Sequence, residues 1–310
     1  MSFTSEVKNE VSKLETLAIE NVTELSALLR NIGVLGESVI RITTENSSVA
    51  RRIFNLLKQK YKVTSKVTVR RGYNFNKNYI YILELKRKIE EISNDLCLTE
   101  DIPKSYLYDD DSLKRAYIRG LFLACGSIND PKKSRYHLEF LVDRKEYAHF
   151  IQKLFNFFEL NSKIIRRDTK YMVYLKEAEK IGDFLRIIGA TSALFYYEDI
   201  RIYRDHKNMT NRLNNCEQAN VDKMIETATK QVHDIELLEE VQAFSLLDEK
   251  VREVAIYRKK YPEASLLELS EIISMETGML ITKSGLYHRM NKIKQLANQI
   301  RENKKNREIK

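Results

Sequence analysis

Apolar and polar residues recur in the same order twice along the first two thirds of the chain. Each copy opens with an apolar helix, rich in small residues, that stops at a glycine. Residues alternating between polar and apolar follow, and then apolar residues at helical spacing, which predicts a helix, a strand and a second helix. The matching segments are 25–33 and 118–126, then 39–43 and 136–140, then 48–60 and 146–159.

Two more alternating segments and a last helix complete each copy. The alternation predicts a pair of neighbouring strands, and a closing amphipathic helix follows them. The segments are 66–71 with 79–83 and helix 86–96 in the first copy, and 163–167 with 171–175 and helix 178–188 in the second. The predicted unit is α-β-α-β-β-α, and a repeat of this kind determines the fold.

The repeat predicts an α+β fold in which residues 1–98 and 112–205 form two halves of one pseudo-twofold domain. Gly33 and Gly126 suit the C-caps of the opening helices. The residues between the halves, 99–111, read as a linker, and Ser112 is a suitable N-cap for the second opening helix.

A polar stretch after the second copy predicts a connecting helix over 210–240, within a helical linker of residues 206–247. The apolar side chains of this stretch recur on one face of a helix. They are Val221, Met224, Ile225, Ala228, Val232, Ile235 and Leu238. The polar side chains from Arg201 to Asn220 leave two roles open, docking of the domains or contact with a DNA backbone.

The last part of the chain, 248–310, predicts an all-α domain. Apolar spacing gives a first helix over 248–261, which Pro262 ends. Ser265 and Glu268 have the spacing of a capping box, so a second helix is expected from residue 266 to about residue 274.

A third helix completes a helix-turn-helix over about residues 265–299. Thr282 or Ser284 caps this helix, which we expect to reach about residue 300. Residues 275–281 then form a loop longer than the usual turn of about three or four residues.

The third helix is expected to read DNA, because such a helix lies in the major groove with its N-terminal residues on the base edges. Polar, basic and aromatic side chains gather at that end. The base-reading candidates are Lys283, Ser284, Tyr287, His288 and Arg289, with Arg289 preferred. Lys292 and Lys294 stand further along, where phosphates are the usual partners.

The distribution of charge favours double-stranded DNA as the partner. The chain has 53 Lys and Arg against 44 Asp and Glu, a formal net charge of +9, and nine basic residues against two acidic ones lie from Lys283 to Lys310. A basic run alone more often marks a solvated helix face with a disordered tail. The capping box and the amphipathic helices beside it favour the DNA-binding interpretation.

Several function classes lack the residues that they need. Cys97, Cys125 and Cys216 form no CxxC or Cys/His cluster, which favours a reducing cytoplasm and leaves no zinc site. A redox-sensor role for Cys125 or Cys216 is the minor alternative to burial as small apolar residues. No apolar run is long enough to span a membrane, and no hydrolytic motif is found. We expect no metal, no cofactor and no small-molecule substrate.

Segment 117–128, YIRGLFLACGSI, resembles the opening helix of LAGLIDADG homing endonucleases. The resemblance implies that residues 1–98 and 112–205 are two LAGLIDADG-like repeats whose opening helices pack at a pseudo-twofold axis. It also implies a metal-binding acidic residue just before the last glycine of each helix. Ile32 and Cys125 stand at those positions. An isoleucine offers no ligand atom and a thiol suits Mg²⁺ poorly, so we expect a nuclease-like scaffold without the chemistry.

The whole chain is similar to the WhiA family of bacterial regulators. The resemblance is carried by MSFTSEVKNE at 1–10, NRLNNCEQAN at 211–220 and KSGLYHR at 283–289. It implies an inactive homing-endonuclease domain joined to a helix-turn-helix. It also implies control of transcription in sporulation or, in low-GC Gram-positive bacteria, in cell division and chromosome segregation.

Basic side chains recur on the paired strands of both copies. Arg70 and Arg71 are matched by Arg166 and Arg167 at a constant spacing, with aromatic residues such as Tyr73 beside them. In homing endonucleases such strands lie on DNA, so phosphate contact is one interpretation. Ordinary surface hairpins of a basic protein are the other.

These observations favour a cytoplasmic, nucleoid-associated, sequence-specific DNA-binding protein that regulates transcription and is not an enzyme. One alternative is a protein-interaction scaffold that holds another regulator or RNA polymerase. A less favoured one is an active endonuclease, against which Ile32 and Cys125 count. The sequence leaves the DNA site and the oligomeric state open.

Overall fold

The structure, a computed structural model, describes residues 2–72, 79–133 and 135–308. The chain divides into two compact units, Met1–Asp205 and His206–Lys310. The fold class is the predicted one, because two four-stranded sheets with their helices make up the first unit and the described part of the second is helical.

The first repeat follows a short N-terminal helix, α1 (Phe3–Val11). Its opening helix is α2 (Ala18–Ile32), and its antiparallel sheet has the strand order β1-β2-β4-β3. The other elements are β1 (Gly33–Leu35), β2 (Ile40–Thr44), α3 (Ser47–Tyr61), β3 (Lys66–Arg71), β4 (Tyr79–Leu85) and α4 (Ile89–Asp95).

The second repeat has the same order of elements after a short 3-10 turn, η1 (Ser105–Leu107). It opens with α5 (Asp111–Cys125), and its sheet has the equivalent strand order β5-β6-β8-β7. The other elements are β5 (Gly126–Ile128), β6 (Leu138–Val142), α6 (Lys145–Phe157), β7 (Lys163–Arg167), β8 (Lys170–Leu175) and α7 (Ala178–Ile188).

Each repeat contains one strand more than the alternation predicts. Strands β1 and β5 are three residues long, too short to show a period of two in the sequence, so the unit is α-β-β-α-β-β-α. The N-cap of α5 is Asp110, not the predicted Ser112. The Asp110 carboxylate accepts from the backbone N–H of Leu113 at 2.9 Å, and Ser112 donates its hydroxyl to the same oxygen.

Gly33 and Gly126 end the opening helices, but for a different reason from the one expected. Their φ angles are −93° and −71°, which is extended backbone and not the left-handed C-cap conformation. Space is the constraint instead. A Cβ at Gly33 would lie 2.4 Å from the Leu29 carbonyl oxygen, and one at Gly126 would lie 2.4 Å from the Phe122 ring.

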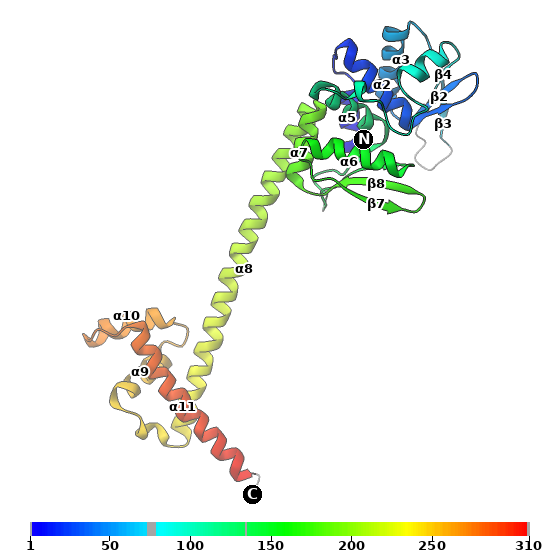
Figure 1. Cartoon of the computed structure of the whole chain (residues 1–310). Coiled ribbons are helices and arrows are strands. Elements are labelled where there is room, and N and C mark those ends of the chain that lie inside the picture. The colour runs from blue at the N-terminus through cyan, green and yellow to red at the C-terminus, as the bar shows by residue number, and fades with distance from the viewer. Residues whose placement is uncertain (1, 73–78, 134, 309–310) are drawn as a thin grey trace. The chain divides into compact units, whose positions relative to one another are not determined.

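Helices α2 and α5 lie side by side at the centre of the first unit (Figure 1). A Cβ at Gly120 would lie 2.4 Å from the Glu24 carbonyl oxygen and 2.9 Å from the Ala27 Cβ, so the two backbones are in close contact. Ala27 and Gly120 are equally far from the glycines that end their helices. The close contact is therefore at the pseudo-twofold axis, and one apolar core continues through both repeats.

The two halves differ at one buried pair. In the first repeat the fully buried Glu24 binds Arg52 with two hydrogen bonds, one of them 2.8 Å long. In the second repeat Tyr117 stands where the first has Glu24, at the same distance from the glycine that ends the helix. Phe150 stands where the first has Arg52, at the same distance from the start of α6 as Arg52 from the start of α3. The rings of Tyr117 and Phe150 pack edge to face, 5.4 Å apart. An ion pair in one half is replaced by an aromatic pair in the other.

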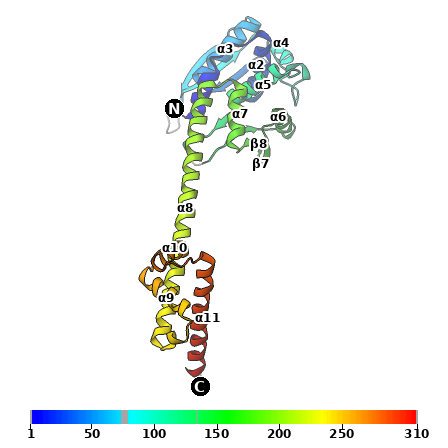
Figure 2. The ribbon, with the colours of Figure 1, turned by 90° about the vertical axis from the view of Figure 1, so that its left-hand side faces the viewer.

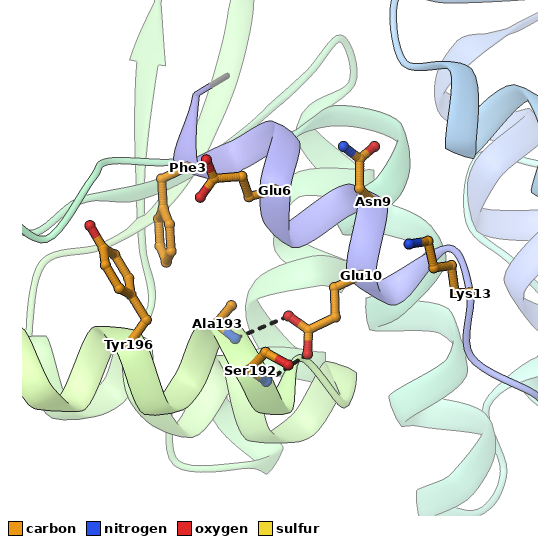
Figure 3. Close-up of a pocket in the computed structure, with 8 residues that line it drawn as sticks. All are labelled: Phe3, Glu6, Asn9, Glu10, Lys13, Ser192, Ala193 and Tyr196. Carbon is orange, nitrogen blue, oxygen red and sulfur yellow. Dashed lines mark hydrogen bonds between the residues drawn. The ribbon is translucent and has the colours of Figure 1, made fainter.

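A long helix, α8 (Thr191–Glu240), begins inside the first unit and not at residue 210 as predicted. Its N-terminus is capped by Glu10 of α1, whose carboxylate accepts from the backbone N–H groups of Ser192 at 2.6 Å and Ala193 at 3.0 Å (Figure 3). Beside this cap the rings of Phe3 and Tyr196 pack 5.6 Å apart. Helix α1 is thus fixed to the start of α8.

The side chains of α8 explain part of the polar cluster. Arg201 pairs with Glu179 and Glu198, and Arg204 donates to the backbone carbonyls of Pro131 and Lys133, all within the first unit. Of the predicted apolar face, Val221 and Ile225 are exposed, and Ala228, Ile235 and Leu238 are buried.

The second unit has an apolar core of its own, and its last helices lie beside the end of α8 (Figure 2). Ile235 and Leu238, from the last turns of α8, are part of this core. The elements are η2 (Ala243–Leu246), α9 (Glu249–Lys260), α10 (Leu266–Thr277) and α11 (Lys283–Glu308). Among the described residues, no helix is both long enough and apolar enough to cross a lipid bilayer.

Candidate nucleic-acid interface

The start of α10 is the predicted capping box. The Ser265 hydroxyl accepts from the Glu268 N–H at 3.2 Å, and the Glu268 carboxylate accepts from the Ser265 N–H at 2.7 Å. The helix continues to Thr277, so the prediction of a loop over 275–281 is wrong for its first three residues. Gly278, in the left-handed conformation with φ +71°, ends the helix. The turn to α11 is therefore residues 278–282.

Two hydrogen bonds define this turn and the start of α11. Thr282, the first of the two predicted caps, accepts from the Gly285 N–H at 3.1 Å, so it and not Ser284 is the N-cap. The Ile281 N–H donates to the Ser274 hydroxyl at 3.0 Å and holds the turn against α10. Helix α11 begins at Lys283 and continues past residue 300 to Glu308.

A buried arginine fixes the other turn of the motif, between α9 and α10. Arg258 is only 1% exposed, and its guanidinium donates to the carbonyl oxygens of Ala264 at 2.6 Å and Tyr261 at 3.4 Å. Burial lowers the pKa of this guanidinium. The side chain joins the end of α9 to the residue before the capping box, so it positions α10 against α9.

The inner side of α11 is apolar and its outer side is polar. Leu286, Met290, Ile293 and Ala297 are buried in the core of the second unit. The opposite face carries Ser284, His288, Asn291 and Gln295, spaced four, three and four residues apart and so aligned along the helix. Three of these are exposed and Asn291 is half-buried.

The five predicted base-reading residues do not share one face. Lys283, Ser284, Tyr287 and His288 are exposed, and Arg289 is half-buried. Successive residues of a helix are about 100° apart, so Tyr287 and Arg289 point to opposite flanks of α11. Asn291 and Gln295, which the prediction does not include, share a face with Ser284 and His288, and this helical spacing is visible in the sequence.

The two lysines predicted to contact phosphates differ in their surroundings. The Lys292 ammonium lies 3.3 Å from the carboxylate of Asp248, the residue before α9, and both side chains are exposed. Lys294 is exposed further along α11. A phosphate at Lys292 would therefore compete with Asp248.

Strand β3, at the edge of the first sheet, carries basic side chains on two faces. Val67 pairs with the fully buried Leu83, so odd-numbered residues of β3 point to the core side and even-numbered ones to the outer side. Lys66 and Arg70 are therefore on the outer face, and Arg71 is not. Tyr73, the aromatic neighbour in the prediction, lies outside the described residues.

Strand β7 also carries basic side chains on two faces, but its even-numbered residues, and not its odd-numbered ones, point to the core side. Ile164 pairs with the fully buried Val173, so even-numbered residues of β7 point to the core side. Lys163 and Arg167 are on the outer face, and Arg166 is on the other.

The register shows which of these residues are equivalent. In the first sheet Gly33 pairs with Ile42, which pairs with Leu83. In the second sheet Gly126 pairs with Phe140, which pairs with Val173. Leu83 and Val173 are therefore equivalent. Arg70 therefore matches Arg167, and Arg166 matches Val69, so the one-for-one equivalence predicted for the two arginine pairs is wrong. The span from the start of the helix to the edge strand is one residue shorter in the second repeat, because α6 is shorter than α3, and the sequence spacing does not reveal this. Lys66 and Lys163, not predicted, are equivalent.

The positions that bind metal in homing endonucleases lie at the ends of α2 and α5. Ile32 is half-buried and offers no ligand atom, and the Cys125 thiol lies 3.7 Å from the side-chain oxygen of Asn31 and 3.5 Å from the Leu121 carbonyl oxygen. Burial raises the pKa of the Cys125 thiol to about 12, so it is protonated at neutral pH. These residues do not fit a hard divalent cation.

Cys125 lies next to hydrogen-bonded, uncharged side chains and to one cation, Lys8. The Asn31 amide donates to the Tyr147 hydroxyl at 3.0 Å, which lies 2.9 Å from the Tyr117 hydroxyl. The ammonium of Lys8 lies 5.8 Å from the centre of the Phe122 ring, and its burial lowers its pKa to about 8. The described residues contain no group of three metal-binding side chains.

Three family domains match successive parts of the chain. Residues 19–99 match the WhiA N-terminal LAGLIDADG-like domain, residues 114–207 the WhiA LAGLIDADG-like domain, and residues 210–297 the WhiA C-terminal HTH domain. The two repeats and the helical unit thus each have a counterpart in one family.

Similar proteins agree along nearly the whole length. A protein of Staphylococcus epidermidis named "Probable cell division protein WhiA" is 44% identical over 97% of this chain and 98% of its own, and a Staphylococcus aureus protein of the same name is 43% identical over the same shares. The crystal structure of full-length WhiA from Thermatoga maritima, 26% identical, covers 96% of this chain and 99% of its own with a TM-score of 0.59. The chain therefore belongs to the WhiA family.

Proposed function

We propose that this protein is a sequence-specific DNA-binding regulator of transcription whose α11 lies in the major groove. The observation that carries the proposal is the polar face of α11, which begins directly after the turn from a capped α10. Ser284, His288, Asn291 and Gln295 follow one another along it. Amide side chains such as those of Asn and Gln pair with adenine edges, and serine and histidine donate or accept there as well.

The flanks of α11 face the walls of the groove in this arrangement. Lys283 and Lys294 are exposed and would contact phosphates. Arg289 and Tyr287, on opposite flanks, would contact the backbones of the two strands. Arg289, the preferred base reader in the sequence, is thus reassigned to affinity and not to specificity.

The outer faces of the two sheets form a second proposed contact with the DNA backbone. Lys66 with Arg70, and Lys163 with Arg167, lie at equivalent positions of the two edge strands. Among the described residues none of the four has an ion-pair partner. Four such cations would supply affinity that depends on salt and carries no sequence information.

We propose that the LAGLIDADG-like domain does not cleave DNA. Ile32 and Cys125 replace the acidic ligands, and a protonated thiol is a poor ligand for the divalent ion that would activate water. Incubation of supercoiled plasmid with the protein and Mg²⁺ or Mn²⁺ tests this. We expect no nicking, and nicking that disappears on Asn31→Ala and Cys125→Ala substitution would overturn the proposal.

The name of the relatives, "Probable cell division protein WhiA", supports a role in cell division. We propose that the protein acts in the cytoplasm at the nucleoid, on genes of cell division and chromosome segregation, and that RNA polymerase or another regulator is its protein partner.

Fluorescence anisotropy of full-length protein on genomic fragments and random duplexes tests the assignment of α11. The double substitution His288→Ala and Asn291→Ala should reduce the preference for the specific fragment at least about tenfold, because each lost base contact is worth about 1–3 kcal/mol. Arg289→Ala should weaken both kinds of DNA alike. A double variant that keeps the full preference would refute the reading face.

A further inference from the structure

An apolar groove lies between the linker of the two repeats and α6. Ile102 and Tyr108 line it together with Phe150 and Phe157 of α6, around a cavity of about 350 Å³, and the rings of Tyr108 and Phe150 pack edge to face 5.0 Å apart. Phe157 is 54% exposed and Ile102 is 44% exposed. An apolar hollow with an exposed aromatic side chain at its edge is the kind of site that serves as a binding hot spot.

The pseudo-twofold axis supplies a second copy of this groove for comparison. On α3 of the first repeat, Arg52, Asn55 and Gln59 stand where α6 has Phe150, Lys153 and Phe157, and they line a groove of their own. Arg52 is bonded there to Glu24 and to the backbone carbonyl of Leu14. The same site in the fold is thus polar and internally bonded in one half and apolar and open in the other. The fold itself does not require the aromatic residues.

The rim of the apolar groove is mainly basic. Lys114, Lys153 and His149 surround it, against a single lining carboxylate, Glu146. The Lys114 ammonium lies 4.1 Å from the centre of the Phe157 ring and 3.2 Å from Asp111. Lys153 is exposed, and no ion-pair partner is found for it within residues 2–72, 79–133 and 135–308. An apolar floor under a basic rim is complementary to apolar side chains with acidic neighbours.

We propose that this groove binds a short acidic peptide segment of another protein, which inserts aromatic or branched aliphatic side chains between the linker and α6. The peptide carboxylates lie over Lys114 and Lys153. The proposal is independent of DNA binding, because none of these residues belongs to α11 or to the outer faces of the sheets.

Defined peptides test the proposal on the full-length protein. Fluorescein-labelled peptides carrying Phe and Leu one helical turn apart among Asp, Glu and Ser are titrated by anisotropy, beside the same peptides with Lys and Arg in place of the acids. We expect the acidic set to bind and the basic set to bind at least about tenfold more weakly. Binding should also weaken as salt increases.

Two substitutions provide the matched controls. Phe157→Gln installs the residue that the first repeat has at the equivalent position, and should weaken acidic-peptide binding about tenfold or more without changing the unfolding midpoint. Gln59→Ala, in the polar groove, should leave binding unchanged.

Three results would overturn the proposal. They are equal binding of acidic and basic peptides, unchanged binding by the Phe157→Gln variant, and no peptide binding up to about 1 mM, the weak end of useful affinity. In the last case, a small apolar dye that binds the wild type and not the variant would identify a small-molecule site instead.

Discussion

Glu24 shows how single residues hold the centre of this fold together. It is fully buried, bonded to Arg52, and its carboxylate lies 3.6 Å from the Arg119 guanidinium, which in turn pairs with Glu20. Replacing all members of such a network by apolar residues often leaves the free energy of unfolding unchanged. Removing one member lowers it, because a buried charge is left without a partner. The effect of this network on stability is therefore measured with single substitutions.

The first prediction concerns this network. Glu24→Ala should lower the free energy of unfolding by about 3–5 kcal/mol, because Arg52 loses its partner inside the core. Glu84→Ala, which breaks the exposed pair with Arg41, is the control and should cost less than about 1 kcal/mol. Urea denaturation followed by circular dichroism measures both. Equal losses in the two variants would contradict the role given to burial.

The second prediction is a dependence on pH. Burial of Lys8 lowers its pKa from 10.5 to about 8, so below pH 8 the folded protein holds an ammonium that the unfolded chain solvates better. This penalty shrinks between pH 8 and 10.5, where the unfolded chain binds the proton and the folded protein does not. Lys8→Met should therefore be more stable than wild type at pH 7. Its advantage should decline as the pH rises above 8, and an advantage that stays constant up to pH 10 would contradict the shift.

At the scale of helices and strands, long periodic segments were predictable and their ends were less so. Helix α7 and the start of α10 agree with the sequence because amphipathic spacing and a capping box fix them locally. The strands β1 and β5 could not be found, because three residues show no period. The start of α8 depends on Glu10, a residue distant in sequence, and spacing within the helix does not reveal such a cap.

The candidate site was predictable to a similar degree. The positions at the start of α11 that the sequence singles out are exposed, except Arg289, which is half-buried because it lies nearer to the inner face of the helix. The equivalence of Arg70 with Arg167 required the strand register, which depends on hydrogen bonds between strands and not on spacing.

The third prediction tests the cap on α8. Glu10→Ala should lower the stability of the first unit by about 1 kcal/mol, because the backbone N–H groups of Ser192 and Ala193 lose their acceptor and the helix N-terminus loses a negative charge. Glu6→Ala is the matched control, since Glu6 lies on the same helix and lines the same hollow (Figure 3). Thermal unfolding measures the shift, and the idea fails if both variants melt alike.

The fourth prediction concerns the turn before α11. Gly278→Ala should destabilise the second unit by about 1 kcal/mol, because the backbone there has φ +71°, which an alanine adopts only with strain. A Cβ at this position would meet no atom within 4 Å, so the backbone conformation alone sets the cost. Gly285→Ala, inside α11, should instead stabilise it by about 0.5–1 kcal/mol. Opposite signs are expected in chemical denaturation, and a neutral Gly278→Ala variant would show that the turn adapts.

The two basic edge strands matter at the scale of the whole molecule, because one chain presents a pseudo-symmetric pair of them. A homodimeric DNA-binding protein achieves such pairing with two chains. Here the repeats provide the pair in one chain, and Lys66, Arg70, Lys163 and Arg167 are the residues that the register makes equivalent.

The fifth prediction uses this symmetry. The double substitution Arg70→Gln and Arg167→Gln, on the outer faces, should make the slope of log K against log salt shallower by about two, roughly one for each lost phosphate contact. The control is Arg71→Gln with Arg166→Gln, which removes the same charge from the other faces and should leave the slope close to that of wild type. Identical slopes for the two double variants would exclude the outer faces as a DNA contact.

The replacement of the Glu24–Arg52 pair by Tyr117 and Phe150 also limits what the gene can do. A chain made of two first repeats would bury two Glu24–Arg52 pairs, and one made of two second repeats would bury two copies of Arg119 without the carboxylates of Glu20 and Glu24. Neither half can substitute for the other, so recombination between the two coding segments, or exchange of halves between neighbouring chains, would yield mismatched centres. Each half therefore depends on the other for the partners of its buried charges.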